Sequence, residues 1–385
     1  MLNKKILIVT SDTGGGHTSA AKAIEAGLAA FAGKLQYLVH ITRIIEEAHF
    51  LGRQAVHLYN FLLRHYQSYV KYYHWAINKL GPDRSLYRFY RKSVEQLISR
   101  FCPNMIVSVH PMVQYGLACI LQELKLLDRV PLVTVVTDPC GNSWRGWASE
   151  KVKLYIVAHE EAKAELVSFG ISEDRIRVCG MPVHPKFEEA VEKLDKAELR
   201  RELGLDEKKF TVFINAGWVG GGNIPKVFEA IADANLDIQA IFLAGRNLNL
   251  LKRAQRVARR AKFPVRVLGY SENMERLMCS SDVMVSKLGG LTTFEALTCR
   301  LPIIIDHITP PMPQEAGTSA LLERHCAGVR LERAADIVPI VRRLLHEPAE
   351  YLKMRAGTSR IVSPGATRKV IATLSDMIAP EGRLA

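Results

Sequence analysis

The sequence has no closely spaced cysteine pair and no apolar run that predicts a membrane span. Its seven cysteines are scattered and include no C-x-x-C pair, which argues against a zinc site and indicates a reducing compartment. The apolar run at residues 6–9 is too short for a signal peptide. The uncharged stretch at 101–122 contains Pro103 and Pro111, so it predicts a buried strand followed by a helix. Membrane contact is therefore expected to be peripheral.

Three signatures of phosphate or metal sites are also absent. The chain has neither a Walker A G-K-[ST] string nor a G-x-G-x-x-G dinucleotide fingerprint. It has no D-x-D triplet, so a metal-bound nucleotide diphosphate of that kind is not expected. We expect no metal and no cofactor, and a leaving diphosphate held by backbone N–H groups, helix N-termini and Lys287.

Acidic residues are fewer than basic ones. The chain has 52 Lys and Arg against 39 Asp and Glu, a formal net charge of +13 and a pI near 9.4. A surplus of this size indicates an anionic partner, which could be nucleic acid, an acidic membrane surface or a phosphorylated substrate. At 385 residues the chain is long enough for two domains with separate cores.

Short apolar runs alternate with helical patterns along the whole chain. Amphipathic helices are predicted at 19–31 and 225–234, and strands at 6–10, 105–109, 132–137, 154–157, 210–215, 239–244, 265–269, 283–286 and 302–306. This alternation predicts an α/β fold with two Rossmann-like, doubly wound domains facing a central cleft. We predict domains at 1–181 and 207–360, a linker at 182–206, and a C-terminal helix at 361–385 that could return to the first domain.

Three glycine-rich turns each follow a predicted strand and precede a predicted helix. They lie at residues 11–17, with Gly14, Gly15 and Gly16; at 217–223, with Gly217 and Gly221; and at 287–293. Backbone N–H groups at such turns form an anion site, although a single turn could be a tight connection without a ligand. Three of them at strand ends predict phosphate binding between the two domains. Glu295 lies slightly deeper in the last helix, where its carboxylate could accept hydrogen bonds from a ribose diol.

Two side chains suited to proton transfer are expected at the same sheet edge. His17 starts a helix, where the helix dipole favours the neutral imidazole. Asp138 follows the strand at 132–137. Either could be a general base toward a hydroxyl. The alternatives are a helix-capping histidine and an aspartate that begins a turn before Pro139.

Aromatic and basic residues alternate between Arg53 and Arg100. The pattern is typical of a membrane interface, and its representative residues are Trp75, Arg88, Arg91 and Lys92. The alternative is an aromatic core with a solvated basic face. A second stretch, residues 246–266, carries eight Lys or Arg and no acid, and it could be only the exposed face of a helix. Nucleic acid could use either patch, but no signature of a nucleic-acid-binding module is present.

With these motifs, the chain resembles the monogalactosyldiacylglycerol synthases and the bacterial diacylglycerol glucosyltransferases, and more distantly the N-acetylglucosaminyltransferase that completes lipid II. The matching strings run in order across almost the whole chain: S-D-T-G-G-G-H at 11–17, T-V-V-T-D at 134–138, G-M-P-V-H-P at 180–185, G-Y-S-E-N at 269–273, S-K-L-G-G-L-T at 286–292 with Glu295, and Q-E at 314–315. One string departs from the family: where a tryptophan is usually followed two positions later by histidine, this chain has Trp144-Arg-Gly-Trp147.

The resemblance implies a GT-B fold and an inverting transfer of galactose or glucose from a UDP-sugar to diacylglycerol. The N-domain would hold the lipid and the C-domain the nucleotide. His17 and Asp138 fall at catalytic-side positions. The implied donor contacts are the backbone between Tyr270 and Met274 for uracil; Gly290, Leu291 and Thr292 for the diphosphate; Glu295 for the ribose; and Gln314 with Glu315 for the sugar hydroxyls.

The expected partners are therefore a UDP-sugar, a diacylglycerol-like lipid and an anionic membrane surface, without nucleic acid. The expected location is cytoplasmic, peripheral on the inner face of the cell membrane. Two alternatives remain open. The missing histidine after Trp144 favours transfer to a polyprenyl-linked or soluble acceptor, and the same motifs could serve a non-catalytic protein that senses a nucleotide or a lipid.

Overall fold

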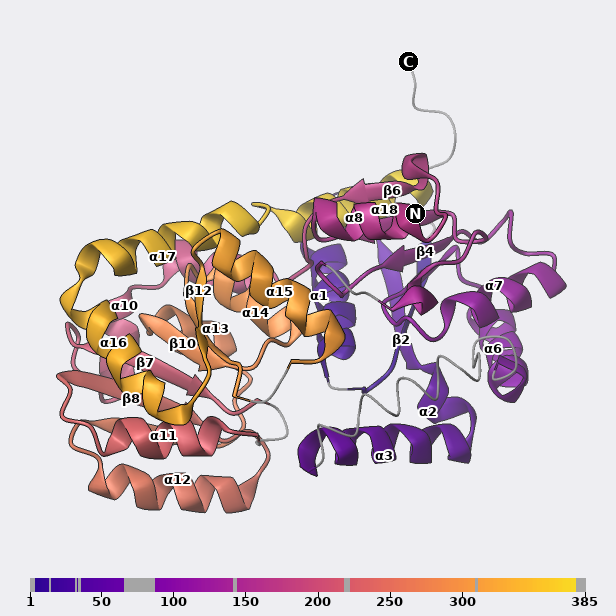
Figure 1. The fold of residues 1–385 in the computed structure, drawn as a ribbon. Coiled ribbons are helices and arrows are strands. Elements are labelled where there is room, and N and C mark those ends of the chain that lie inside the picture. Colours follow the sequence, from indigo (N-terminus) through magenta and orange to yellow (C-terminus); the bar gives the residue numbers. More distant parts are fainter. Residues whose placement is uncertain are drawn as a thin grey trace. The chain divides into compact units, whose positions relative to one another are not determined.

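The computed structural model describes residues 4–13, 15–31, 33, 36–65, 87–140, 144–217, 222–308 and 311–378. The chain forms two compact units, residues 1–185 with 363–385 (unit 1) and residues 186–362 (unit 2), and each is described by itself (Figure 1). The predicted linker is wrong for most of its length. Residues 186–202 form helices α9 (Lys186–Lys193) and α10 (Lys196–Glu202), which belong to unit 2.

Unit 1 is built on a parallel sheet with strand order β2-β1-β3-β4-β5-β6. The strands are β1 (Lys4–Thr10), β2 (Tyr37–Arg43), β3 (Met105–Ser108), β4 (Leu132–Val135), β5 (Leu154–Val157) and β6 (Ile176–Val178). The sequence did not predict β2 and β6. Both are edge strands whose side chains are only partly buried, so neither has the continuous apolar run of a strand that is buried on both faces.

Helices cover both faces of the unit 1 sheet. They are α1 (Gly16–Phe31), α2 (Ile44–Ala48), α3 (Phe50–His65), α6 (Tyr87–Phe101), α7 (Gln114–Glu123), α8 (Glu160–Ser168) and α18 (Ala366–Ile378). The C-terminal α18 lies beside the N-terminal α1 (Figure 1). The two helices approach closely at Gly27, where a Cβ atom would lie 2.6 Å from Cγ2 of Thr367. The end of the chain therefore completes the core of unit 1.

Unit 2 has a second parallel sheet, with strand order β12-β11-β10-β7-β8-β9. Its strands are β7 (Phe210–Asn215), β8 (Ile238–Leu243), β9 (Val265–Leu268), β10 (Val283–Ser286), β11 (Ile303–Asp306) and β12 (Gly328–Leu331). The helices around it are α11 (Ile224–Ala232), α12 (Leu248–Arg260), α13 (Met274–Cys279), α14 (Gly290–Thr298), α15 (Pro313–Arg324), α16 (Ile337–His346) and α17 (Pro348–Ile361). The sequence missed only β12, a half-buried edge strand.

Each sheet reverses its strand order beside its first strand, between β1 and β3 in unit 1 and between β7 and β10 in unit 2. Such a reversal opens a crevice at the carboxyl ends of the strands, where ligands bind in open α/β sheets. The first predicted glycine turn follows β1, and the other two follow β7 and β10. The fold therefore places all three turns at the two ligand-binding edges. None of the helices in the described ranges is both long and apolar enough to span a bilayer.

Candidate active site and nucleotide site

His17 lies at the switch point of unit 1, in the first turn of α1. Its Nδ1 is 2.9 Å from Thr137 Oγ1, beyond the end of β4, and a ring N–H donates to the carbonyl of Val109. The ring meets the His110 ring edge-on, with centroids 4.6 Å apart. Burial lowers the pKa of His17 to about 4, and the bond to Val109 opposes this only in part. His17 is therefore a neutral imidazole at pH 7.

Asp138 lies beside the same cluster and is bound by Trp147. The Nε1–H group of Trp147 donates to Asp138 Oδ2 at 2.6 Å, and the Trp147 ring lies 6.1 Å from the His17 ring. Trp147 is completely buried, so it fixes the position of the carboxylate. Burial raises the pKa of Asp138 to about 6, and the Trp147 bond opposes this shift. The structure brings the two expected catalytic-side residues together around Trp147.

His110 is a component of this site that the sequence analysis missed. It follows β3, its Nδ1 accepts the N–H of Met112 at 3.3 Å, and its Nε2 lies 2.9 Å from Thr13 Oγ1. Because Nδ1 is an acceptor, Nε2 carries the hydrogen and donates to Thr13. Burial, and the nearby His17, hold the pKa of His110 well below its usual value. His110 thus ties the glycine turn after β1 to the end of β3.

Replacing His110 by phenylalanine keeps a ring but removes both nitrogens. The N–H of Met112 and the hydroxyl of Thr13 would lose their partners, and an unsatisfied buried polar group costs about 1–3 kcal/mol. We expect the free energy of unfolding, measured by urea denaturation, to fall by about that amount, with UDP affinity unchanged because the residues expected to bind the nucleotide lie in unit 2. A loss below about 0.5 kcal/mol would contradict the hydrogen bonds assigned to His110.

Carboxylates hold the glycine turn after β1. Glu46 Oε1 accepts from the Ser11 hydroxyl at 2.8 Å and from the N–H of Asp12 at 2.6 Å, and Asp12 forms an ion pair with Arg43 at 2.8 Å. Burial raises the pKa of Glu46. Gly15 has a φ of +82°, which glycine adopts without strain. Gly14 lies outside the described residues, and Gly16 begins α1.

The two glycine turns of unit 2 meet at its switch point. Gly217 and Gly222 have φ angles of +77° and +70°, and a Cβ atom on Gly222 would lie 2.5 Å from Nζ of Lys287. The end of the Lys287 side chain therefore lies directly over the turn after β7, where the positive φ of Gly222 favours glycine. Asp306, at the end of β11, has a pKa raised by burial, and the charge of Lys287 opposes this shift. Gly221 lies outside the described residues.

The third turn leads directly into α14. Gly289 is the N-cap residue, and Gly290, Leu291 and Thr292 form the first turn, whose N–H groups have no partner within the helix. Leu291 is 3% exposed, so its side chain belongs to the core and its backbone alone is suited to an anion. This helix start has the geometry expected of a diphosphate site.

Glu295 lies in the second turn of α14, where it is half-buried. Burial raises its pKa to about 7; the charge of Lys186 opposes the shift and Glu275 adds to it. Lys186 begins α9 and forms an ion pair with Glu275 at 2.8 Å. The sequence analysis missed Lys186, although it directly follows the G-M-P-V-H-P string. The Glu295 carboxyl is therefore partly protonated and partly ionised near neutral pH.

The other expected donor residues lie in the loop before α13 and at the starts of α13 and α15. Tyr270 is 50% exposed and lies under the guanidinium of Arg246, with Cζ 4.5 Å from the ring centroid. Met274 is the first residue of α13. Glu315 is in the first turn of α15, where Oε2 accepts the N–H of Met312 at 3.1 Å, so one carboxylate oxygen caps its own helix. The side chain of Gln314 lies outside the described part of the chain.

The three basic residues expected at the membrane differ in whether they form ion pairs within the part of the chain that the structure describes. Arg88 and Lys92 are exposed on α6. Arg91 forms ion pairs with Glu95 at 3.0 Å and Glu123 at 2.6 Å, so its charge is balanced within unit 1. Trp75 lies outside the described residues.

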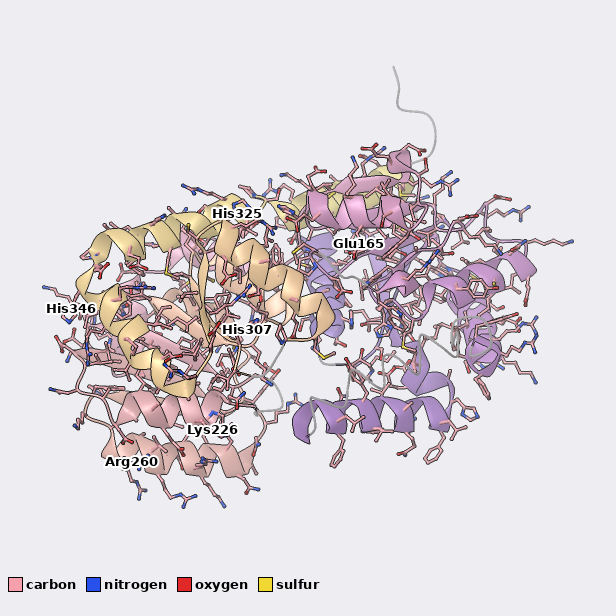
Figure 2. The ribbon with its side chains drawn as sticks, viewed as in Figure 1. Glu165, Lys226, Arg260, His307, His325 and His346 are labelled. Atoms are coloured by element: carbon pink, nitrogen blue, oxygen red, sulfur yellow. The ribbon has the colours of Figure 1, made fainter. Side chains whose placement is uncertain are left out.

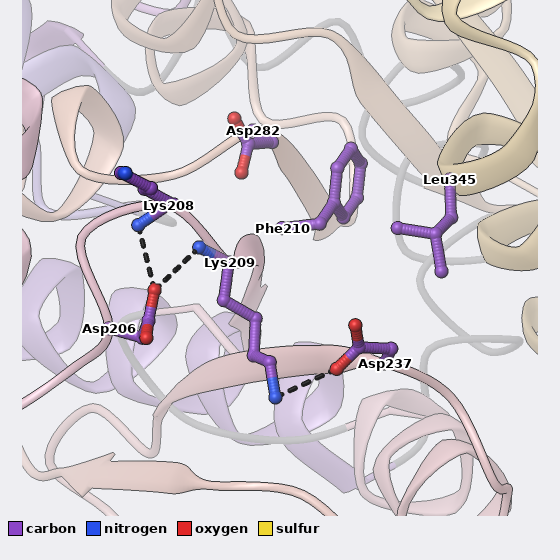
Figure 3. A pocket seen from close by; sticks show the side chains of 7 residues that line it. All are labelled: Asp206, Lys208, Lys209, Phe210, Asp237, Asp282 and Leu345. Atoms are coloured by element: carbon purple, nitrogen blue, oxygen red, sulfur yellow. Dashed lines mark hydrogen bonds and ion pairs between the residues drawn. The ribbon is translucent and has the colours of Figure 1, made fainter.

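A pocket of about 460 Å³ lies at the opposite edge of the unit 2 sheet (Figure 3). It is lined by Phe210 at the start of β7 and by several charged residues. Two of them, Lys209 and Asp237, form an ion pair at 2.8 Å, and Asp206 accepts the N–H groups of Lys208 and Lys209. Because ligands of such sheets bind at the carboxyl edge, this pocket is not the nucleotide site.

Comparisons with known proteins assign the family. A family model of monogalactosyldiacylglycerol (MGDG) synthase matches residues 17–183. The chloroplastic monogalactosyldiacylglycerol synthase 1 of Arabidopsis thaliana is 29% identical, over 99% of this chain and 72% of its own length. A probable monogalactosyldiacylglycerol synthase of Nicotiana tabacum is 30% identical, over 97% of this chain and 71% of its own length. The chain belongs to the monogalactosyldiacylglycerol synthase family.

Solved structures agree in fold. The MurG protein of Acinetobacter baumannii matches with a TM-score of 0.63 at 12% identity, over 97% of this chain and 99% of that one. The predicted GT-B fold is confirmed. As a member of the MGDG synthase family, this enzyme is a glycosyltransferase of glycolipid synthesis. The enzyme class predicted from the sequence is also confirmed.

Proposed function

We propose that this MGDG synthase family member transfers galactose or glucose from a UDP-sugar to the hydroxyl of diacylglycerol, with inversion, at the cytoplasmic surface of the cell membrane. The observation that carries the proposal is the cluster at the switch point of unit 1. There a half-buried carboxylate, Asp138, lies beside a neutral imidazole, His17, and both contact one buried tryptophan. This chemistry suits removal of a proton from an alcohol.

Asp138 is the better general base of the two. A base is most effective when its pKa lies just below the working pH, and the pKa of Asp138 is about 6. His17, with a pKa of about 4, is a much weaker base, and its ring already bonds Thr137 and Val109. In the proposed step, Asp138 takes the hydroxyl proton, and the oxygen attacks the anomeric carbon opposite UDP. His17 orients the acceptor.

Unit 2 would hold the donor. The first-turn N–H groups of α14 and the ammonium of Lys287 would stabilise the leaving diphosphate, so the proposed step requires no metal and no cofactor. Glu295 would accept hydrogen bonds from the ribose diol. Tyr270 and Met274 would place backbone groups at the uracil, and Gln314 with Glu315 would face the sugar.

The glycine turn after β1, called here the acceptor loop, favours an uncharged alcohol over a phosphorylated one. The turn after β1 is held by the carboxylates of Asp12 and Glu46, and Asp12 already has Arg43 as its counter-ion. A polyprenyl phosphate at this edge would meet these acids without an unpaired cation from the same network. Diacylglycerol carries no charge and meets no such repulsion, which supports it over the polyprenyl alternative.

Helix α3 supports delivery of the acceptor from a membrane. Its buried side holds Val56, and its outward side exposes large apolar side chains among the polar residues Arg53, Gln54 and His57. Leu51, Leu58 and Phe61 are 60%, 52% and 50% exposed. These three residues follow helical spacing, so they form one stripe, the α3 stripe. On its inner side, Asn60 Nδ2 donates to the backbone carbonyl of Asp12 at 3.0 Å, which ties α3 to the acceptor loop.

Product formation from defined substrates tests the proposal. The enzyme is incubated with radiolabelled UDP-galactose or UDP-glucose and diacylglycerol in anionic liposomes, and lipid-soluble label is measured. We expect label with one of the two donors, and none in the Asp138→Ala and His17→Ala variants. No label from any UDP-sugar would defeat the proposal. Label only on a polyprenyl phosphate would favour the second acceptor class, and UDP binding without turnover would favour a sensor.

A further inference from the structure

Helix α12 has a basic face that the proposed reaction does not use. The helix packs on unit 2 through Leu250, Ala254 and Val257. The exposed residues Lys252, Arg256 and Arg259 are spaced four and three positions apart, so they form one line along the helix, opposite its buried side. Figure 2 shows the end of this helix, marked by Arg260, at the outer surface of unit 2.

These three cations are not neutralised locally. Their neighbours Arg253 and Arg260 pair with Glu229 at 2.8 Å and Asp233 at 3.6 Å. Lys252, Arg256 and Arg259 form no ion pair with any residue that the structure describes. The chain contains no Asp or Glu from residue 238 to residue 271. The line of cations therefore keeps its full positive potential toward solvent.

An apolar side chain extends the same line. Leu248 begins α12 and is 71% exposed, one helical turn before Lys252. Lys and Arg stems are long enough to reach lipid phosphates while a neighbouring leucine enters the headgroup region. A nucleic acid backbone would satisfy the cations but would offer no apolar environment to Leu248. The combination favours a lipid surface.

We propose that the α12 basic face, formed by Leu248, Lys252, Arg256 and Arg259, binds the surface of an anionic lipid bilayer. The proposal rests on the proposed function, since it gives unit 2 a membrane contact of its own in addition to the α3 stripe of unit 1. The two contacts differ in character: the α3 stripe is apolar, and the α12 basic face depends on anionic lipid and is weakened by salt.

The test is a charge-neutralising triple variant, Lys252→Gln/Arg256→Gln/Arg259→Gln. A basic residue near an anionic surface strengthens binding about fivefold, so three together contribute about a hundredfold. The matched control is Arg342→Gln/Lys353→Gln/Arg360→Gln, which removes three exposed cations from α16 and α17. Partition of the full-length proteins is measured by co-sedimentation with vesicles of phosphatidylcholine, with and without about one-third phosphatidylglycerol.

We expect the α12 variant to lose about a hundredfold in partition onto the anionic vesicles at low salt, and the control to lose less than about fivefold. Neither should change its partition onto neutral vesicles. Equal losses for the two variants would show that net charge alone matters and would overturn the proposal. So would undiminished vesicle binding by the α12 variant accompanied by loss of binding to single-stranded or duplex oligonucleotides.

The same proteins separate this proposal from the proposed function. Glycosyl transfer to diacylglycerol dispersed in a neutral detergent needs no anionic surface, so the α12 variant should retain wild-type activity there. Full activity in detergent together with unchanged vesicle binding would overturn the α12 basic face alone. Absence of transfer by the wild-type enzyme under both conditions would overturn the proposed function.

Discussion

Asp138→Asn should lower kcat by about 10²–10⁴-fold, the usual contribution of a general base. The substitution keeps the size of the side chain and an oxygen that can accept the Trp147 N–H. It removes the carboxylate that takes the proton from the hydroxyl of the lipid substrate. The measurement is the initial rate of lipid glycosylation at saturating donor. UDP affinity should not change, because the residues proposed to bind the nucleotide lie in unit 2.

The pH profile identifies which group is the base. A base must be unprotonated to act, so wild-type kcat/KM should fall tenfold per pH unit below about pH 6, the pKa of Asp138. This limb should disappear from the residual activity of Asp138→Asn. A limb near pH 4 would instead match the pKa of His17 and would move the base to the imidazole.

Trp147→Phe provides the matched control for this assignment. The Trp147 N–H lowers the pKa of Asp138, so its removal should shift the acidic limb to higher pH while the limb itself remains. Trp147 is completely buried, so the melting curve of the Trp147→Phe protein should be recorded as well, to show that the variant is folded. An unchanged limb in a folded variant would contradict the link between Trp147 and the base.

Glu295→Gln should weaken UDP binding by about tenfold or more, measured by calorimetric titration at pH 8. The carboxylate would accept two hydrogen bonds from the ribose diol, and loss of a hydrogen bond to a charged group costs about 1.5–3 kcal/mol. Glu198→Gln on α10 is the control, since it makes the same charge change at an exposed position. Equal affinities of Glu295→Gln and wild type would defeat the ribose assignment.

The pH dependence of UDP binding provides a second test of the Glu295 assignment. The pKa of Glu295 is raised to about 7, so the carboxyl is mostly protonated at pH 6 and mostly ionised at pH 8. If the ribose binds the ionised form, wild-type affinity should be about tenfold higher at pH 8 than at pH 6. The phosphates of UDP also titrate, but Glu295→Gln retains that contribution, so the difference between the two proteins isolates Glu295.

Without UDP, the stability of the wild-type protein should fall as the pH rises, whereas its UDP affinity should rise. A pKa that is raised by folding means that ionisation opposes the folded state, so wild type loses stability as the pH rises through about 7. Glu295→Gln has no such charge and should be the more stable protein at pH 8. If Glu295 only complemented the helix dipole, the variant would melt lower and UDP affinity would stay the same.

Much of the fold and of the candidate donor site could be predicted from the sequence, for a local physical reason. Strands such as β5, β7 and β10 are buried on both faces and therefore appear as continuous apolar runs. The glycine turns before α1 and α14 are also local signals, because backbone geometry and helix starts depend on neighbouring residues. The strands missed, β2, β6 and β12, are edge strands whose partial exposure removes that signal.

Only the tertiary structure decided what surrounds each functional side chain. His110 and Thr13 are 97 residues apart and meet because β3 pairs with β1, an adjacency that no local pattern encodes. Lys186 meets Glu275 and Glu295 because α9 packs beside α13 and α14. Burial then sets the protonation of His17, Asp138 and Glu295, because desolvation disfavours the charged form of each. The sequence by itself determined which groups are present and on which turns they lie, and the packing of distant segments determined their pKa values and their partners.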